Sequence, residues 1–134
     1  MRYLLDTCVM IWFFEGSRRI GRALQDTLTD PLNDLLVSDI NILEVVIKHQ
    51  LGKLPLPLTP SRIFPSLIRK HGMELLPLDT AAIFRLESLP LLHRDPFDRL
   101  LVAQAQLNKL TLVTPDPQIQ AYDVPWFWTE GSST

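Results

Sequence analysis

The sequence has few of the residues that build disulfides, zinc sites or nucleotide-binding loops. Cys8 is the one cysteine among 134 residues, so no internal disulfide can form, which fits a reducing compartment. There is no Cys-x-x-Cys pair and no cysteine–histidine cluster, which argues against a structural zinc site. With five glycines and no GxGxxG, GxSxG or HExxH motif, the chain shows no sign of a phosphate-cradling loop or of the common hydrolase sites.

Long apolar runs are also absent. No segment approaches the roughly 20 apolar residues of a membrane span. The start of the chain does not look like a signal peptide, because Asp6 interrupts the apolar run and no small-residue cleavage site follows. We therefore expect a cytoplasmic protein with no membrane interaction. The composition is 46% apolar and 21% charged, and we assign residues 1–130 to a single domain and residues 131–134 to a disordered tail.

The formal net charge of −2 gives no overall attraction to nucleic acid. Basic residues do occur in small groups: Arg18, Arg19 and Arg22; Lys48, His49 and Lys53; Arg69 and Lys70; Arg94 and Arg99. Nucleic-acid binding would therefore have to use a basic rim around an acidic centre. Scattered, solvated charges explain each group equally well when it is taken alone.

Short apolar segments alternate with amphipathic ones along the chain. We expect strands at residues 3–6, 35–37, 74–76, 112–114 and 124–128, and helices at 7–15, 18–29, 39–51, 60–70, 79–88 and 96–109. The last strand is expected at a sheet edge, because it contains a proline. This alternation indicates an α/β fold with a parallel sheet covered on both faces. In such sheets, ligands bind beyond the carboxyl ends of the strands.

Four acidic residues that are far apart in the sequence stand out, and they are Asp6, Glu44, Asp98 and Asp116. Asp6 and Asp116 follow expected strands, Glu44 lies in an otherwise apolar helical stripe, and Asp98 lies in the first turn of a helix. A carboxylate is costly to bury unless it is paired or binds a metal. If all four converge, they form a site of oxygen ligands for Mg²⁺ or Mn²⁺, and metal-assisted phosphodiester chemistry follows.

Each of these residues also has a purely structural interpretation. Asp6 can cap the helix that follows it. Glu44 can pair with Lys48 one turn later, which at a surface stabilises a helix by about 0.2–0.5 kcal/mol. Asp116 can cap a helix or form an Asx-turn before Pro117.

The densest motif is His-Arg-Asp-Pro-Phe-Asp at residues 93–98. Asp95 followed by Pro96 is typical of a helix N-cap and first helical residue. Asp98 is then the third helical residue, where the helix dipole favours a carboxylate without requiring one. We therefore prefer Asp98 as the ligand and Asp95 as the cap.

Other candidates are weaker. Cys8 lies among apolar residues and is expected to be an inert core thiol. The histidines His49, His71 and His93 show no ligand spacing and are treated as surface or rim residues. The apolar run at residues 11–14 is expected in the core, and part of it is available as a dimer or partner surface.

Four segments carry a family resemblance: residues 4–7 (LLDT), 44–54 (EVVIKHQLGKL), 93–101 (HRDPFDRLL) and 112–116 (LVTPD). In this order they resemble the motifs of PIN-domain ribonucleases, and they are most similar to the VapC toxins of bacterial type II toxin–antitoxin pairs. The resemblance implies a PIN-like α/β/α sandwich with a central, mainly parallel five-stranded sheet. It also implies an Mg²⁺- or Mn²⁺-dependent endoribonuclease, a homodimer, and a cognate VapB-like antitoxin that binds over the site.

Carried over by motif, the acidic residues are Asp6, Glu44, Asp98 and Asp116, with Thr114 as a polar neighbour. Family members often have an aromatic residue where Leu43 stands, serine where Asn41 stands, and histidine, serine or asparagine where Cys8 stands. These differences concern substrate contacts more than metal binding, since all four carboxylates are present.

The leading hypothesis is an endoribonuclease in which Asp6, Asp98 and Asp116 bind one or two Mg²⁺ ions. Glu44 would complete the metal shell or orient the attacking water. The alternative is a non-catalytic PIN-like module that binds RNA or a protein, with the acids serving as caps and surface pairs. A metal-dependent phosphatase of another α/β fold is disfavoured, because the Asp6-Thr7-Cys8 segment lacks the second acid of an Asp-x-Asp motif.

Overall fold

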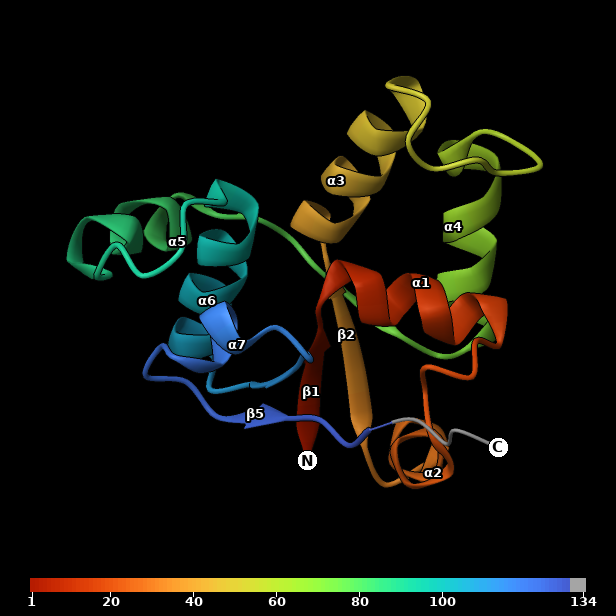
Figure 1. Ribbon diagram of the computed structural model, residues 1–134, viewed down its shortest axis with the longest axis horizontal. Coiled ribbons are helices and arrows are strands. Elements are labelled where there is room, and N and C mark those ends of the chain that lie inside the picture. Colours follow the sequence, from red (N-terminus) through yellow and green to blue (C-terminus); the bar gives the residue numbers. More distant parts are fainter. Residues whose placement is uncertain (131–134) are drawn as a thin grey trace.

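A computed structural model of the chain describes residues 1–130 (Figure 1). The disordered tail expected at residues 131–134 lies outside the described residues. No helix within residues 1–130 is both long enough and apolar enough to span a membrane.

Five strands form one central sheet in the order β3-β2-β1-β4-β5, and every pairing between neighbours is parallel. Their bounds are β1 Arg2–Leu5, β2 Asp34–Ser38, β3 Glu74–Leu76, β4 Thr111–Val113 and β5 Trp126–Phe127. In the central strand, Leu4 pairs with Leu36 of β2 and with Leu112 of β4. All five predicted strands are present, and β5 is an edge strand as expected. The sheet is wholly parallel, as the short continuous apolar segments indicated.

Seven α-helices and one 3₁₀ helix lie within residues 1–130. Their bounds are α1 Thr7–Glu15, α2 Arg22–Thr29, α3 Asp39–Gln50, α4 Pro60–Lys70, α5 Thr80–Arg85, η1 Leu86–Ser88, α6 Pro96–Asn108 and α7 Pro117–Gln120. Four predicted helices (α1, α3, α4 and α6) agree with the structure to within one residue. The helix predicted at 79–88 is split into α5 and η1. The four-residue helix α7 was not predicted, because a segment this short carries no apolar periodicity.

The helix predicted at 18–29 begins only at Arg22. Ser17 accepts the N–H of Ile20 at its carbonyl, at 3.2 Å, and the N–H of Arg19 at its hydroxyl, also at 3.2 Å. These bonds form a turn rather than a helix, and Gly21 is the extended N-cap of α2. Apolar spacing alone could not show this, because local side-chain bonds compete with helix formation.

Caps place the helices that carry the acidic residues. Ser38 caps α3 because its hydroxyl accepts the N–H of Ile40 at 2.9 Å. Asn41 Oδ1 in turn accepts the N–H of Ser38 at 2.6 Å, which completes a capping box. Asp95 caps α6 by accepting the N–H of Phe97 at 2.8 Å. The Asp95 cap was expected from the sequence, whereas the sequence allowed either Ser38 or Asp39 as the cap of α3. The two caps start α3 and α6 at defined points, and so set the direction in which Glu44 and Asp98 project.

Helices cover the sheet on both faces and produce an α/β/α sandwich (Figure 1). Tyr3 and Leu5 of β1 pack into one core with side chains of α1, α2 and α4, whereas Leu4 packs into a second core with side chains of α5, α6 and α7. This division follows from the alternation of side chains along a strand. Because apolar side chains fill both faces, polar chemistry is left to the carboxyl ends of the strands.

Candidate active site

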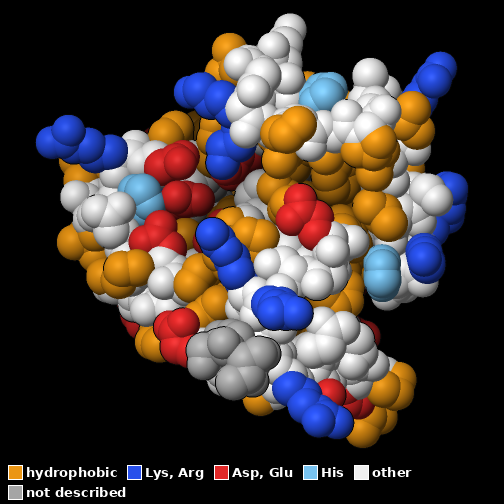
Figure 2. Space-filling model, turned by 45° about the vertical axis from the view of Figure 1, so that its right-hand side comes forward, with side chains coloured by type: hydrophobic (Ala, Val, Ile, Leu, Met, Phe, Trp, Pro, Cys, Tyr) orange, Lys and Arg blue, Asp and Glu red, His pale blue; other side chains and the backbone are white. Residues whose placement is uncertain are grey.

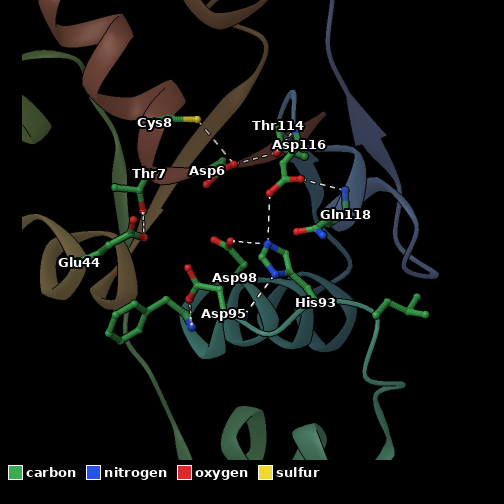
Figure 3. Close-up of polar contacts among 12 residues, drawn as sticks. Asp6, Thr7, Cys8, Glu44, His93, Asp95, Asp98, Thr114, Asp116 and Gln118 are labelled. Carbon is green, nitrogen blue, oxygen red and sulfur yellow. Dashed lines mark hydrogen bonds and ion pairs between the residues drawn. The ribbon is translucent and has the colours of Figure 1, made fainter.

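One cleft at the carboxyl edge of the sheet collects the predicted acidic residues (Figure 3). It has a volume of about 430 Å³. Six carboxylates line it, those of Asp6, Glu15, Glu44, Asp95, Asp98 and Asp116, and we call it the acidic cleft. Figure 2 shows the corresponding gathering of Asp and Glu side chains beside a histidine in one hollow of the surface. The four acids proposed from the sequence are therefore brought together, and Asp95 joins them.

Asp6 is buried at the end of β1, with 6% of its surface exposed. It occupies the N-cap position of α1, but its side chain makes no capping bond, so the capping interpretation was wrong. Its Oδ2 instead accepts a hydrogen bond of 2.8 Å from the Thr114 hydroxyl. Burial raises the pKa of Asp6 from 3.8 to about 6; the Thr114 bond opposes this rise and the charge of Glu44 adds to it.

Glu44 is buried in α3 with two partners. Its Oε1 accepts from the Thr7 hydroxyl at 2.9 Å, and its Oε2 lies 2.6 Å from Lys48 Nζ. The predicted pair with Lys48 is thus present, but it is not a surface pair, because Glu44 is only 8% exposed. Within residues 1–130, Lys48 supplies the single ammonium group that lines the acidic cleft.

Asn41 positions Thr7, which in turn bonds to Glu44. Its Nδ2 donates to the Leu5 carbonyl at 3.1 Å and to the Thr7 hydroxyl at 2.9 Å, and Thr7 in turn donates to Glu44. Asn41 is fully buried, so it orients Thr7 and does not reach a substrate. The serine-to-asparagine difference noted in the sequence is therefore structural here.

Asp98 and Asp116 meet at His93. His93 Nε2 lies 2.9 Å from Asp98 Oδ2 and 3.2 Å from Asp116 Oδ2. The backbone N–H of Asp95 donates to His93 Nδ1 at 3.2 Å. Because Nδ1 accepts, the ring proton of the neutral histidine lies on Nε2, where it is directed at the two carboxylates.

Asp98 is half-buried at the start of α6. Burial raises its pKa from 3.8 to about 8, and the charges of Asp6 and Asp95 add to the rise. The raised pKa reflects first the burial of Asp98 and then its position among other carboxylates.

Asp116 combines two roles that the sequence analysis treated as alternatives. Its Oδ1 caps α7 by accepting the N–H of Gln118 at 2.8 Å, while its Oδ2 faces His93. Its own N–H donates to Thr114 Oγ1 at 3.1 Å. The cap fixes one oxygen and leaves the other directed into the cleft.

The treatment of His93 as a rim residue missed its contacts with two of the predicted acids. The signal was local: His93 lies two residues before the Asp95 cap, in the densest motif of the sequence. The Asp95 N–H is not used inside α6, and it is this group that orients the ring. The usual sequence spacing of metal ligands does not identify His93, because the Asp95 N–H holds its ring against the two carboxylates.

Cys8 packs against the apolar core, as expected, and it also lines the acidic cleft, which was not expected. Its side chain is half-buried, and its Sγ lies 3.7 Å from Asp6 Oδ2. Burial raises the pKa of the thiol far above its ordinary value, and the Asp6 charge raises it further. The thiol therefore stays protonated and cannot act as a nucleophile.

The chemistry of the cleft suits a divalent cation. Within residues 1–130, the group with possible ligand atoms all within 4.8 Å of one another consists of His93, Asp98 and Asp116, and Asp6 lies beside this group in the same cleft. His93 Nε2 carries a proton, which leaves carboxylate oxygens as the available ligands. Oxygen ligands and uncompensated negative charge are what Mg²⁺ and Mn²⁺ select.

Comparison with known proteins agrees with this fold. Residues 3–125 match the PIN domain family. The solved structures that resemble the chain include VapBC2 from Rickettsia felis bound to a fragment of its promoter DNA, with a TM-score of 0.72 and 15% identity over 96% of this chain and 100% of the other. FitAcB from Neisseria gonorrhoeae gives a TM-score of 0.65 and 23% identity over 93% and 96% of the two chains.

A toxin–antitoxin complex from Klebsiella pneumoniae gives a TM-score of 0.59 and 23% identity over 89% of this chain and 90% of the other. A search of curated proteins finds no match. At these identities the solved structures show a shared fold. The family match extends over nearly the whole chain, and the chain therefore belongs to the PIN domain family.

Proposed function

We propose that the protein is an Mg²⁺- or Mn²⁺-dependent endoribonuclease, and that it is the toxin of a type II toxin–antitoxin pair. The observation that carries this proposal is the convergence of Asp6, Asp98 and Asp116 in one cleft, next to the buried Glu44. Membership of the PIN domain family supports it. A single domain over residues 1–130 and a cytoplasmic location belong to the same proposal.

In this proposal Asp6, Asp98 and Asp116 hold the metal. The metal, when bound, lowers the pKa of a water molecule and stabilises the charge that develops on the phosphate. The protein's own part is to orient the ligands: Thr114 holds Asp6 through its hydroxyl, and His93 holds Asp98 and Asp116 through its Nε2.

Glu44 has a different part. Thr7 and Lys48 fix its two oxygens, so its carboxylate is oriented before substrate arrives. It completes the metal shell or orients the attacking water. Lys48 Nζ pairs this buried carboxylate with a positive charge 2.6 Å away.

The test is cleavage of a mixed RNA pool by the purified, partner-free chain in Mg²⁺, in Mn²⁺ and in EDTA. Asp98→Asn and Asp6→Asn are compared with Asp26→Asn, which removes one carboxylate from an exposed position in α2. We expect metal-dependent cleavage that both cleft variants lose and the control keeps, with circular dichroism showing that all variants fold. Cleavage that survives in both cleft variants, or no cleavage by the folded chain, would favour the non-catalytic RNA- or protein-binding module.

We further propose a VapB-like antitoxin as the partner and a homodimer as the assembly. The antitoxin proposal rests on the solved relatives, one of which is described as a toxin–antitoxin complex and others as VapBC bound to DNA. An Arg or Lys side chain of a partner could enter the acidic cleft and displace the metal. Co-expression with the small protein encoded next to this chain should yield a complex that does not cleave RNA, and light scattering of the free chain should give the mass of a dimer.

A further inference from the structure

A second hollow adjoins the acidic cleft. It has a volume of about 450 Å³ and lies between the second half of α3 and the start of α6. Glu44, Lys48 and Asp95 line both hollows and form the ridge between them. The side chains found only in the second hollow are Ile47, Leu51, Lys53, Arg94, Pro96 and Phe97, and we call this hollow the basic trough.

The unpaired side chains found only in the basic trough are positively charged, whereas the acidic cleft is mainly negative. Lys53 and Arg94 are both exposed, and no carboxylate of residues 1–130 lies within 4.0 Å of either. Lys48, in contrast, is bound to Glu44. Two free cations therefore border a hollow that opens beside a cleft lined by six carboxylates, and Figure 2 shows Lys and Arg side chains flanking the acidic patch.

The walls of the trough are apolar. Leu51 is 62% exposed, and Phe97 is half-buried at its edge. Apolar side chains beside free cations match a nucleotide, which offers a flat base together with a charged phosphate. The aromatic ring supplies a stacking surface that accepts any base.

We propose that the basic trough binds single-stranded RNA adjacent to the phosphate that is cleaved. Lys53 and Arg94 contact a neighbouring phosphate, and a base covers Leu51 and Phe97. This inference rests on the proposed nuclease activity and adds the path of the substrate. An RNA strand with one phosphate in the acidic cleft has to continue beyond that cleft. The basic trough lies next to it and offers positive charge to the following phosphate.

An acidic peptide would also satisfy the two cations. RNA is favoured because the basic trough and the acidic cleft share one wall, and the proposed reaction cuts a phosphodiester in that cleft. The carboxylates of the cleft that bind no metal repel a polyanion, and the two cations of the trough offset this repulsion.

The test compares two double variants that remove the same charges. Lys53→Ala with Arg94→Ala changes the trough, and Lys70→Ala with Arg22→Ala removes one Lys and one Arg from exposed positions in α4 and α2. Binding of a labelled, mixed-sequence single-stranded RNA is measured in the Asp98→Asn background with Mg²⁺ over a range of salt concentrations. KM and kcat are measured in the native background.

We expect the trough pair to bind about tenfold more weakly and to lower the slope of log affinity against log salt by about 0.7, the change expected for one lost phosphate contact. In the native background KM should rise with little change in kcat. The control pair should leave all three quantities unchanged.

The outcomes separate the two proposals. If the native chain cleaves RNA and the trough pair has the KM of the control pair, the RNA path is wrong and the nuclease activity stands. If the native chain neither binds nor cleaves RNA, both fail. If the trough pair loses an acidic protein partner but keeps its RNA affinity and KM, the trough is a protein-binding surface and the RNA path is wrong.

Discussion

The Thr114 hydroxyl donates a hydrogen bond of 2.8 Å to Oδ2 of Asp6, across 108 positions of sequence. The two residues follow β4 and β1, and these strands lie side by side with Leu5 opposite Val113. The same hydroxyl accepts the N–H of Asp116 at 3.1 Å. One buried threonine thus joins the carboxylate of Asp6 to the backbone of Asp116.

Thr114→Val should raise the pKa of Asp6 above its present value of about 6. The Thr114 bond is the largest influence that lowers this pKa, and valine has the same shape without the hydroxyl. We expect a loss of about 0.5–2 kcal/mol in the free energy of unfolding, because a buried hydrogen bond is removed. Carboxyl ¹³C titration by NMR in metal-free protein measures the pKa, and an unchanged value would show that Thr114 does not control Asp6.

Asp98→Asn should stabilise the metal-free protein at pH 8. Asp98 has a pKa of about 8 in the folded chain against an ordinary value of 3.8, so its contribution to stability is full below about pH 4 and is lost as pH rises through 8. Asparagine does not titrate and can accept the bond from His93. We expect a gain of about 1 kcal/mol at pH 8, a modest figure because solvent screens a partly exposed carboxylate.

Thermal unfolding in EDTA at several pH values measures this gain. It should shrink as pH falls from 8 to 5, and Asp26→Asn should show no such trend. A variant that is less stable than the native chain at pH 8 would mean that Asp98 acts mainly as a helix-terminal acid.

Metal binding should be stronger at pH 8 than at pH 6. Protons on Asp98 and, at the lower end, on Asp6 compete with the cation, since their pKa values are raised to about 8 and about 6. Calorimetric titration with Mn²⁺ in two buffers of different ionisation enthalpy should show proton release on binding. Removal of the metal with EDTA should lower Tm more at pH 8 than at pH 6. Affinity that does not depend on pH would exclude these carboxylates as ligands.

His93 should remain a hydrogen-bond donor and not a ligand. The Asp95 N–H directed at Nδ1 keeps the ring proton on Nε2, next to Asp98 and Asp116. The ¹⁵N spectrum should therefore show a protonated Nε2 both without metal and with Mg²⁺. A shift of the proton to Nδ1 on adding Mg²⁺ would show that Nε2 binds the metal.

Substitution of His93 separates orientation from packing. His93→Gln keeps an N–H near the two carboxylates and should retain most of the metal affinity. His93→Ala leaves Asp98 and Asp116 without their shared donor and should weaken Mn²⁺ binding by about tenfold or more. Equal losses in the two variants would indicate that the ring matters for packing alone.

Much of the fold could be predicted from local patterns. The strands were recognisable because they are short, continuous apolar runs, and α3, α4 and α6 because their caps and prolines mark their ends. The late start of α2 and the existence of α7 depend on single side-chain hydrogen bonds, made by Ser17 and Asp116, that periodicity does not record.

The candidate site could be predicted only in part, and its acids illustrate why. The choice of Asp6, Glu44, Asp98 and Asp116 followed from carboxylates in or beside apolar segments, where desolvation makes an unpaired charge costly. The preference for Asp98 over Asp95 came from the capping pattern, and the cap at Asp95 is present. Which oxygen of each acid faces the cleft could not be predicted, because that depends on contacts between distant segments.

The sequence by itself determined the class of fold and the set of acids, because apolar periodicity, helix caps and the cost of buried charge all act over a few neighbouring residues. Tertiary structure decided how the acids are held. The order β3-β2-β1-β4-β5 sets Thr114 beside Asp6, and the loop before α6 turns His93 toward Asp98 and Asp116. These contacts exist only once parallel strands align their carboxyl ends, and that alignment is a property of the sheet as a whole.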